Sequence, residues 1–154
     1  MWKINGLASS RPPSCGSRAS DTAAAIEFYK KAFGAVEICR MPEPNGSRIM
    51  HATVRIGDSM MMMADIFPEY GGKGPSELGG SPVVLNIYCD NVDEVVESAA
   101  ANGAKVNMPP TDMFWGDRYA KLTDPFGHEW SIATHVKDMT EGNCPGLIPS
   151  NTRT

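Results

Sequence analysis

The sequence predicts an α+β fold in which two related βαβββ modules join their sheets into one curved, cup-shaped mixed sheet with the helices outside. Two observations support this fold. Residues 124–127, DPFG, predict a tight turn between two strands, because Pro fixes φ at the second position and Gly accepts a positive φ. A related strand–turn–strand unit surrounds Gly57, so that residues 59–65 correspond to residues 129–135. One helix and one four-stranded sheet cannot bury both faces of the sheet, whereas two such units can.

The first module is predicted to span residues 21–66, after an irregular segment, 1–20, that is rich in Ser, Gly, Pro and Arg. Asp21 is a favourable N-cap for a helix that ends before Gly34, and apolar residues at positions i, i+3 and i+7 share one face of that helix. Its first strand is atypical, weak or absent, because the adjacent Pro12 and Pro13 are unfavourable in a central strand. Strands are predicted at residues 35–40, 49–56 and 59–64.

The second module is predicted to span residues 83–136. It follows a linker, 67–82, whose Gly and Pro content indicates irregular structure. A strand at 83–89 leads into a helix that Asp90 caps and Gly103 ends. Strands at 104–108, 118–123 and 129–135 follow, with a loop at 109–117, and the tail 137–154 is expected to be loosely attached.

Composition narrows the classes of function. The chain has 154 residues, a net charge of −4 and no run of Lys and Arg, which argues against nucleic acid as a partner. A membrane-spanning helix needs about 20 apolar residues in a row, and no apolar run here is nearly that long, so we expect no membrane partner. The N-terminal segment lacks the apolar stretch of a secretory signal, and we therefore predict a cytoplasmic protein.

The chain has four cysteines, and none of them forms a CxxC pair or a cluster with zinc-finger spacing. Cys39 and Cys89 fall in predicted strands, and we expect both to be buried thiols. Cys15 and Cys144 fall in the irregular ends, where no neighbouring residue indicates a lowered thiol pKa.

Four stretches of the chain resemble the vicinal-oxygen-chelate superfamily, which includes glyoxalase I, extradiol dioxygenases and the bleomycin and fosfomycin resistance proteins. They are similar in particular to its PhnB-like branch. The resemblance covers about residues 21–138 and implies the cup-shaped glyoxalase/bleomycin-resistance fold. The stretches are AAAIEFYKKAFGAVE at 23–37, RIGDSMMMMAD at 55–65, VVLNIYCDNVDEV at 83–95 and MFWGDRYAKLTDPFGHEWSIATHV at 113–136.

The resemblance also implies where a metal would bind. Metal-dependent members carry a His on the first strand, a Glu on the fourth, a His or Glu on the fifth and a Glu on the eighth. Here residues 1–50 contain no His, and the other three positions fall at Met61, Asn86 and Ser131. Since none of these is a usual ligand for a divalent metal in this fold, we predict no metal and no cofactor.

Strand alternation predicts the lining of the cup. His51 should face inward, and Met61 and Met63 should do so while Met60 and Met62 pack under the helices. Methionines would form an adaptable apolar wall, whereas two of the four are expected simply to fill the core. Phe114 and Trp115 could stack on a ligand or close the core or a dimer interface. The predicted ligand-binding residues are His51, Met61, Met63, Asn86, Tyr88, Phe114, Trp115, Tyr119 and Ser131, and no catalytic residue is assigned.

We therefore predict a metal-independent protein that binds a small molecule, in the manner of the resistance proteins that sequester an aromatic or cationic drug or metabolite. The alternative is a metal-dependent lyase or isomerase, or a dioxygenase, of the same superfamily. A degenerate gene product is a third interpretation, because both ends of the chain depart from the family pattern. We also predict a homodimer, since a weak first strand would leave an open sheet edge that needs covering.

Overall fold

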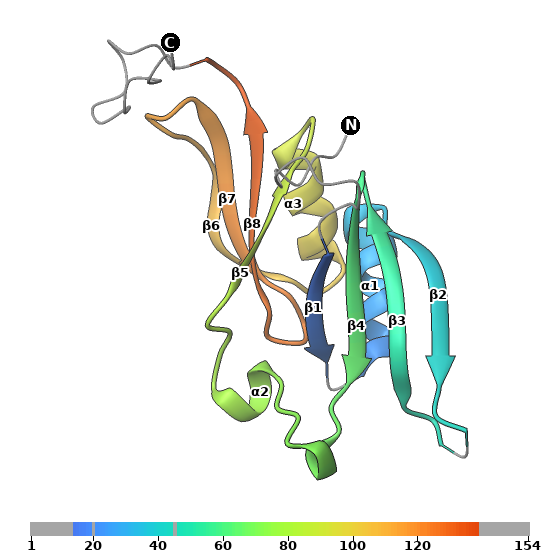
Figure 1. Ribbon diagram of the computed structural model, residues 1–154. Helices are drawn as coiled ribbons and strands as arrows, with labels where there is room; N and C mark the ends of the chain where they lie inside the picture. The colour runs from blue at the N-terminus through green and yellow to red at the C-terminus, as the bar shows by residue number, and fades with distance from the viewer. Residues whose placement is uncertain (1–13, 20, 45, 139–154) are drawn as a thin grey trace, which may run out of the picture.

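The computed structural model of the chain describes residues 14–19, 21–44 and 46–138. These residues form an α+β fold of two modules with the same order of elements (Figure 1). The first module contains β1 (Ser14–Ala19), α1 (Thr22–Phe33), β2 (Val36–Pro42), β3 (Ile49–Ile56) and β4 (Ser59–Asp65). The second contains β5 (Val84–Tyr88), α3 (Val92–Ala101), β6 (Lys105–Asp112), β7 (Asp117–Thr123) and β8 (Glu129–His135).

Each module forms its own four-stranded mixed sheet. The strand orders are β1-β4-β3-β2 and β5-β8-β7-β6, and in each sheet the first pair is parallel and the others are antiparallel. The predicted tandem βαβββ fold is therefore confirmed. In the described part of one chain no strand pairing joins the two sheets, so each module presents its own open face opposite its helix.

The first strand is better formed than the sequence indicated. Residues 14–19, expected to be irregular, form β1 and pair in parallel with β4 from Ser14↔Met60 to Ala19↔Asp65. β1 lies at the edge of its sheet and begins after the two prolines, so the exclusion of proline from central strands does not apply. Pro12 and Pro13 themselves lie outside the described residues, as does the tail from residue 139.

Two other segments differ from the predictions. The Gly/Pro linker contains a 3-10 turn, η1 (Pro68–Tyr70), and one helical turn, α2 (Pro75–Leu78). Pro at the first helical position favours both, because its missing N–H has no partner there in any case. β6 continues to Asp112 where a loop was expected, since β6 is an edge strand and tolerates its two prolines at a register shift.

The two helices pack against each other and join the modules into one core. Asp21 caps α1 as predicted, whereas α3 is capped by Asn91 and not by Asp90. The Tyr29 and Phe33 rings of α1 stack at 5.8 Å, and each contacts Trp130 of β8, at 5.3 and 4.7 Å. Figure 1 shows α3 between the two sheets and α1 behind β4 and β3.

Candidate ligand-binding site

The open face of the second sheet is organised around the carboxylate of Asp117, at the start of β7. Asp117 is 6% exposed and accepts three hydrogen bonds from separate elements. Tyr88 Oη of β5 donates at 2.8 Å, Trp115 Nε1 of the β6–β7 turn at 3.2 Å, and His135 Nδ1 of β8 at 2.9 Å. A buried carboxylate is costly unless its oxygens are paired, so these three donors hold it in one position.

Strand register explains why these side chains share a face. Asp117 lies opposite His135 and Tyr119 opposite Ala133, and Ala133 is in turn the parallel partner of Tyr88. Side chains on paired residues point to the same side of a sheet. This face is opposite the one that packs on α3, because Ile132 and Leu122 on the other side belong to the core.

Aromatic rings surround the carboxylate. Trp115 contacts Tyr119 edge-on at 5.7 Å and Phe114 edge-on at 5.0 Å. Phe114 is exposed and extends this group to the solvent. Gly116 makes the turn possible, since its φ of 96° lies in the region that favours glycine. The result is a rigid aromatic surface beside a fixed negative charge.

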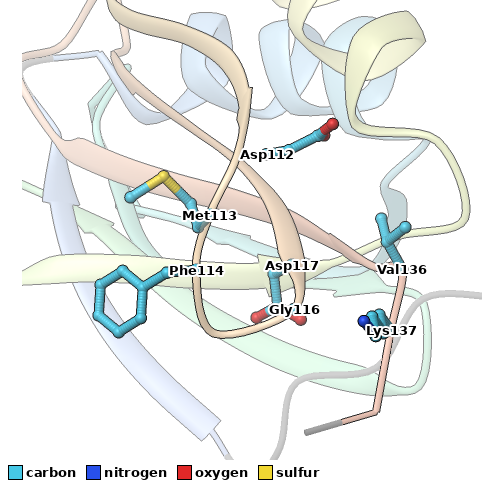
Figure 2. Close-up of a pocket in the computed structure, with 7 residues that line it drawn as sticks. All are labelled: Asp112, Met113, Phe114, Gly116, Asp117, Val136 and Lys137. Carbon is cyan, nitrogen blue, oxygen red and sulfur yellow. The ribbon is translucent and has the colours of Figure 1, made fainter. Parts of the chain in front are cut away.

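A pocket of about 410 Å³ adjoins this cluster. Figure 2 shows Met113 and Phe114 on one side of the β6–β7 turn, and Val136 and Lys137 beyond Gly116 and Asp117 on the other. The volume suits a small organic molecule. The pocket is lined by Asp112, Met113, Phe114, Gly116, Asp117, Val136 and Lys137.

Neighbouring groups change the acidity of two side chains here. Hydrogen bonds to Asp117 and to Asp138 raise the pKa of His135, which favours its imidazolium form beside the two carboxylates. Burial, with the hydrogen bond to Asp117, raises the pKa of Tyr88 to about 12. At neutral pH, Tyr88 is therefore an uncharged donor to Asp117.

Asn86 and Ser131 lie next to this cluster on the same face, where Ser131 Oγ donates to Asn86 Oδ1 at 2.6 Å. They occupy two positions at which metal-dependent relatives would carry ligands. An amide and a hydroxyl that are hydrogen-bonded to each other are poor ligands for a divalent metal. Residues 14–138, apart from Ser20 and Asn45, hold no group of three or more His, Cys, Asp or Glu that could bind a metal ion.

The first sheet corrects two of the predicted site residues. Met61 and Met63 are 4% and 2% exposed and belong to the core with α1, whereas Met62 is 43% exposed on the open face. The predicted inward and outward sets on β4 are therefore reversed. His51 lies on the open face of this sheet, on a different sheet from the Asp117 cluster, and its Nε2 is 3.0 Å from Thr53 Oγ1.

The reversal has a simple cause. The β3–β4 turn has two residues, between the pair Ile56↔Ser59, and the β7–β8 turn has five, between Thr123↔Glu129. Ile56 faces the core and Thr123 the open face, so aligning Gly57 with Gly127 sets β4 and β8 out of step by one residue. A slip of one residue exchanges the two faces of a strand. The position that corresponds to Ser131 is Met62, because Asp65 of β4 and Thr134 of β8 each accept the first N–H of their helix, and a thioether there is no better a divalent-metal ligand than one at Met61.

Most of the predicted residues of the second module come together. Asn86, Tyr88, Tyr119 and Ser131 share one face, with Trp115 and Phe114 at its end. Asp117 and His135 were not among the predicted binding residues, although they form the centre of the cluster. The predicted hairpin could have revealed that the two are partners. Asp117 lies six residues before Thr123 and His135 six residues after Glu129, and Thr123 and Glu129 form the pair that closes the turn.

The sequence comparison identifies the family. The family described as Glyoxalase/Bleomycin resistance protein/Dioxygenase superfamily matches residues 11–132. The chain belongs to this superfamily. It is similar to an uncharacterized protein of Mycobacterium tuberculosis (strain ATCC 25618 / H37Rv), at 43% identity over 77% of this chain and 71% of that protein. Protein YjdN of Escherichia coli (strain K12) is 31% identical over 76% of this chain and 90% of that protein.

Two solved structures share the fold. The crystal structure of TioX from Micromonospora sp. ML1 matches with a TM-score of 0.64 at 22% identity, over 82% of this chain and 100% of that one. A glyoxalase/bleomycin resistance protein/dioxygenase family enzyme from Burkholderia phytofirmans PsJN matches with a TM-score of 0.64 at 23% identity, over 80% and 97%. No helix among the described residues is long and apolar enough to cross a membrane.

Proposed function

We propose that this superfamily member, which we assign to the PhnB-like branch, binds a small aromatic or cationic molecule without a divalent metal. The ligand would lie on the open face of the β5-β8-β7-β6 sheet. One observation carries the proposal: a buried carboxylate, Asp117, is fixed beside several aromatic rings and a pocket of about 410 Å³. A drug or a metabolite of this chemistry would suit a cytoplasmic sequestering protein.

The chemistry of the face supports this ligand class. The Trp115 and Phe114 rings offer flat surfaces for stacking, and the face of a Trp ring attracts a cation with about 0.5–2 kcal/mol. Asp117 adds a negative charge whose position is fixed before the ligand arrives. Preorganised groups strengthen binding because little ordering remains to be done on association.

The alternative is the metal-dependent lyase, isomerase or dioxygenase chemistry of the superfamily. It would need a His or carboxylate at positions that here carry Met62, Asn86 and Ser131. Elemental analysis of dialysed protein separates the two functions. A stoichiometric divalent metal that survives dialysis would favour the enzyme and contradict our proposal.

We also propose that the protein forms a homodimer that covers the open faces. Exposed apolar side chains lie on both faces, with Val36 and Met62 on the first sheet and Val84 on the second. Pairing the first sheet of one copy with the second sheet of another would bury these side chains and enclose the ligand. Light scattering should give twice the 16.6 kDa of one chain, and a clean monomer would refute the dimer.

A thermal-shift screen of aromatic cations, aromatic anions and neutral aromatic metabolites tests the binding function. At a ligand concentration of about 100 times Kd, the melting temperature should rise by about 5–10 °C. Trp115→Ala should abolish the rise. Tyr70→Ala is the matched control, because Tyr70 is an aromatic residue of the linker and 82% exposed. A screen without any shift, or equal shifts in both variants, would contradict the proposal.

A further inference from the structure

The open face of the first sheet gathers sulfur and imidazole side chains. Thr53 of β3 lies opposite Cys39 of β2 on one side and opposite Met62 of β4 on the other, and His51 lies opposite Met41. Directly opposed residues of antiparallel strands have Cβ atoms about 4.5–5.5 Å apart. Three strands therefore bring one thiol, one imidazole and two thioethers to the same part of this face.

A bulge in β2 turns Cys39 and Met41 to this face. The register shifts between Glu37 and Cys39, and Glu37 lies on the helix side, where it binds Lys30 of α1 at 2.9 Å and Arg40 at 2.7 Å. Cys39 is consequently exposed, and the prediction that it is a buried thiol was wrong. Cys89 is buried, as predicted.

His51 folds over its neighbour on the strand. Its Nε2 lies 3.0 Å from Thr53 Oγ1, so the ring extends into the row that Cys39, Thr53 and Met62 form across the strands. Thr53 is only 8% exposed although it points to the open face. The side chains around it therefore already cover Thr53.

We propose that this face binds a soft monovalent metal ion, Cu(I), through Cys39 Sγ, a ring nitrogen of His51 and Met62 Sδ, with Met41 Sδ as a fourth ligand. Thiolate and thioether sulfur select Cu(I) over hard cations. The thiolate of Cys39 would neutralise the single positive charge. Arg55, the charged residue of β3 on the same face, is directed to the β3–β4 turn, where its Nη1 donates to Gly57 O at 2.8 Å.

The site lies on the other sheet from the proposed organic-ligand site and shares no residue with it, and in the proposed dimer the two faces would lie opposite each other between the subunits. Of the positions at which the superfamily carries divalent-metal ligands, it uses one, Met62 of β4, and its other ligands lie on β2 and β3. Failure of one proposal therefore leaves the other standing. A divalent metal retained on dialysis and a Cu(I) ion bound under reducing conditions are distinct observations.

Competition with bicinchoninate for Cu(I), under anaerobic reducing conditions, tests the site on the full-length protein. Wild type should bind one Cu(I) per chain. Cys39→Ser should weaken binding by about 100-fold or more, because even the outer partners of a bound metal are worth about 10–100-fold in affinity. Met62→Leu, which conserves volume, should weaken binding by about tenfold. X-ray absorption should show both sulfur and nitrogen ligands.

Met108→Leu is the matched control, because Met108 is a partly exposed methionine of β6, which belongs to the other sheet. It should leave the affinity unchanged, as should Cys15→Ser and Cys144→Ser. If Cys39→Ser does not fold, the double variant Met41→Leu/Met62→Leu tests the same site with the thiol intact. Equal affinity in wild type and in the folded site variants, or loss of binding in Cys15→Ser or Cys144→Ser instead, would overturn the proposal.

Discussion

The two modules share a backbone plan but carry different chemistry on their open faces. In both, the last strand accepts a hydrogen bond from the first N–H of the helix: Thr22 N donates to Asp65 Oδ1 at 2.6 Å, and Val92 N to Thr134 Oγ1 at 2.8 Å. The face of the first sheet carries sulfur, whereas that of the second carries a fixed carboxylate among aromatic rings. The core positions preserve the fold, whereas the positions on the open faces differ in chemistry between the modules.

The turns differ as much as the faces. The two-residue turn of the first module exposes Asp58, whose Oδ1 accepts one bond from Ser59 Oγ at 3.0 Å. The five-residue turn of the second module buries Asp124, whose carboxylate accepts five hydrogen bonds. Their donors are Tyr29 Oη at 2.6 Å, Trp130 Nε1 at 2.9 Å, Phe126 N at 2.9 Å, and His128 N and Nδ1 at 2.9 and 3.2 Å.

Asp124→Ala should give the largest loss of stability. Because Tyr29 belongs to α1, the carboxylate connects the two modules, and its removal leaves buried donors unsatisfied. We expect the free energy of unfolding to fall by about 3 kcal/mol or more in urea titrations. Asp124→Asn should lose less, since it keeps one acceptor oxygen. Asp58→Ala is the control from the first module and should change little. Similar losses for Asp58→Ala and Asp124→Ala would remove the distinction between the turns.

The Asp124 cluster also predicts that the stability of the protein falls at acidic pH. Burial favours a raised pKa for Asp124, but hydrogen bonds from His128, Tyr29 and Trp130 outweigh it and hold that pKa below its ordinary value. A depressed carboxyl pKa stabilises the fold above the unfolded-state pKa of about 4 and loses this contribution as the pH falls through the folded-state value.

The Asp117 cluster predicts the opposite dependence, through His135. Its pKa is raised above 6.5 by hydrogen bonds to Asp117 and Asp138, so its contribution to stability is fully present below about pH 6.5. That contribution is lost as the pH rises through the folded-state pKa. Melting temperatures measured from about pH 6 to about pH 9 should fall with pH in wild type and fall less in His135→Gln.

Asp138→Asn separates the two carboxylates that act on His135. It removes the weaker of the two hydrogen bonds that raise the pKa of His135 and keeps the one to Asp117. The slope of melting temperature against pH should therefore lie between those of wild type and His135→Gln. An unchanged slope in His135→Gln would show that other groups cause the pH dependence.

Much of the fold could be predicted from the sequence, because helix caps and strand alternation are local signals. Which residues of β4 face the core could not be predicted in this way. It depends on the number of turn residues between Ile56 and Ser59, and an alignment of the two turn glycines ignores that number. The open face of the second sheet followed from alternation at Asn86 and Ser131. Its centre did not, because Asp117 and His135 meet only through pairing of β7 with β8.

The smallest loss of stability should come from removing the ion pairs between each helix and its sheet. In the first module Lys30 of α1 binds Glu37 of β2 at 2.9 Å, and in the second Asp93 of α3 binds Arg118 of β7 at 2.7 Å. Exposed pairs are weak because water and salt screen them.

Glu37→Gln and Arg118→Gln should each lower the melting temperature by only about 1–2 °C at low salt, and by less at high salt. The pair of the first module is the better shielded, since burial is greater at Glu37 than at Asp93. Glu37→Gln should therefore keep more of its effect as salt increases. The pKa of Glu37 supports this order, because hydrogen bonds from Arg40 and Lys30 lower it to about 2. Equal salt dependence in the two variants would show that both modules use these pairs in the same way, so that the modules differ only in their turns and open faces.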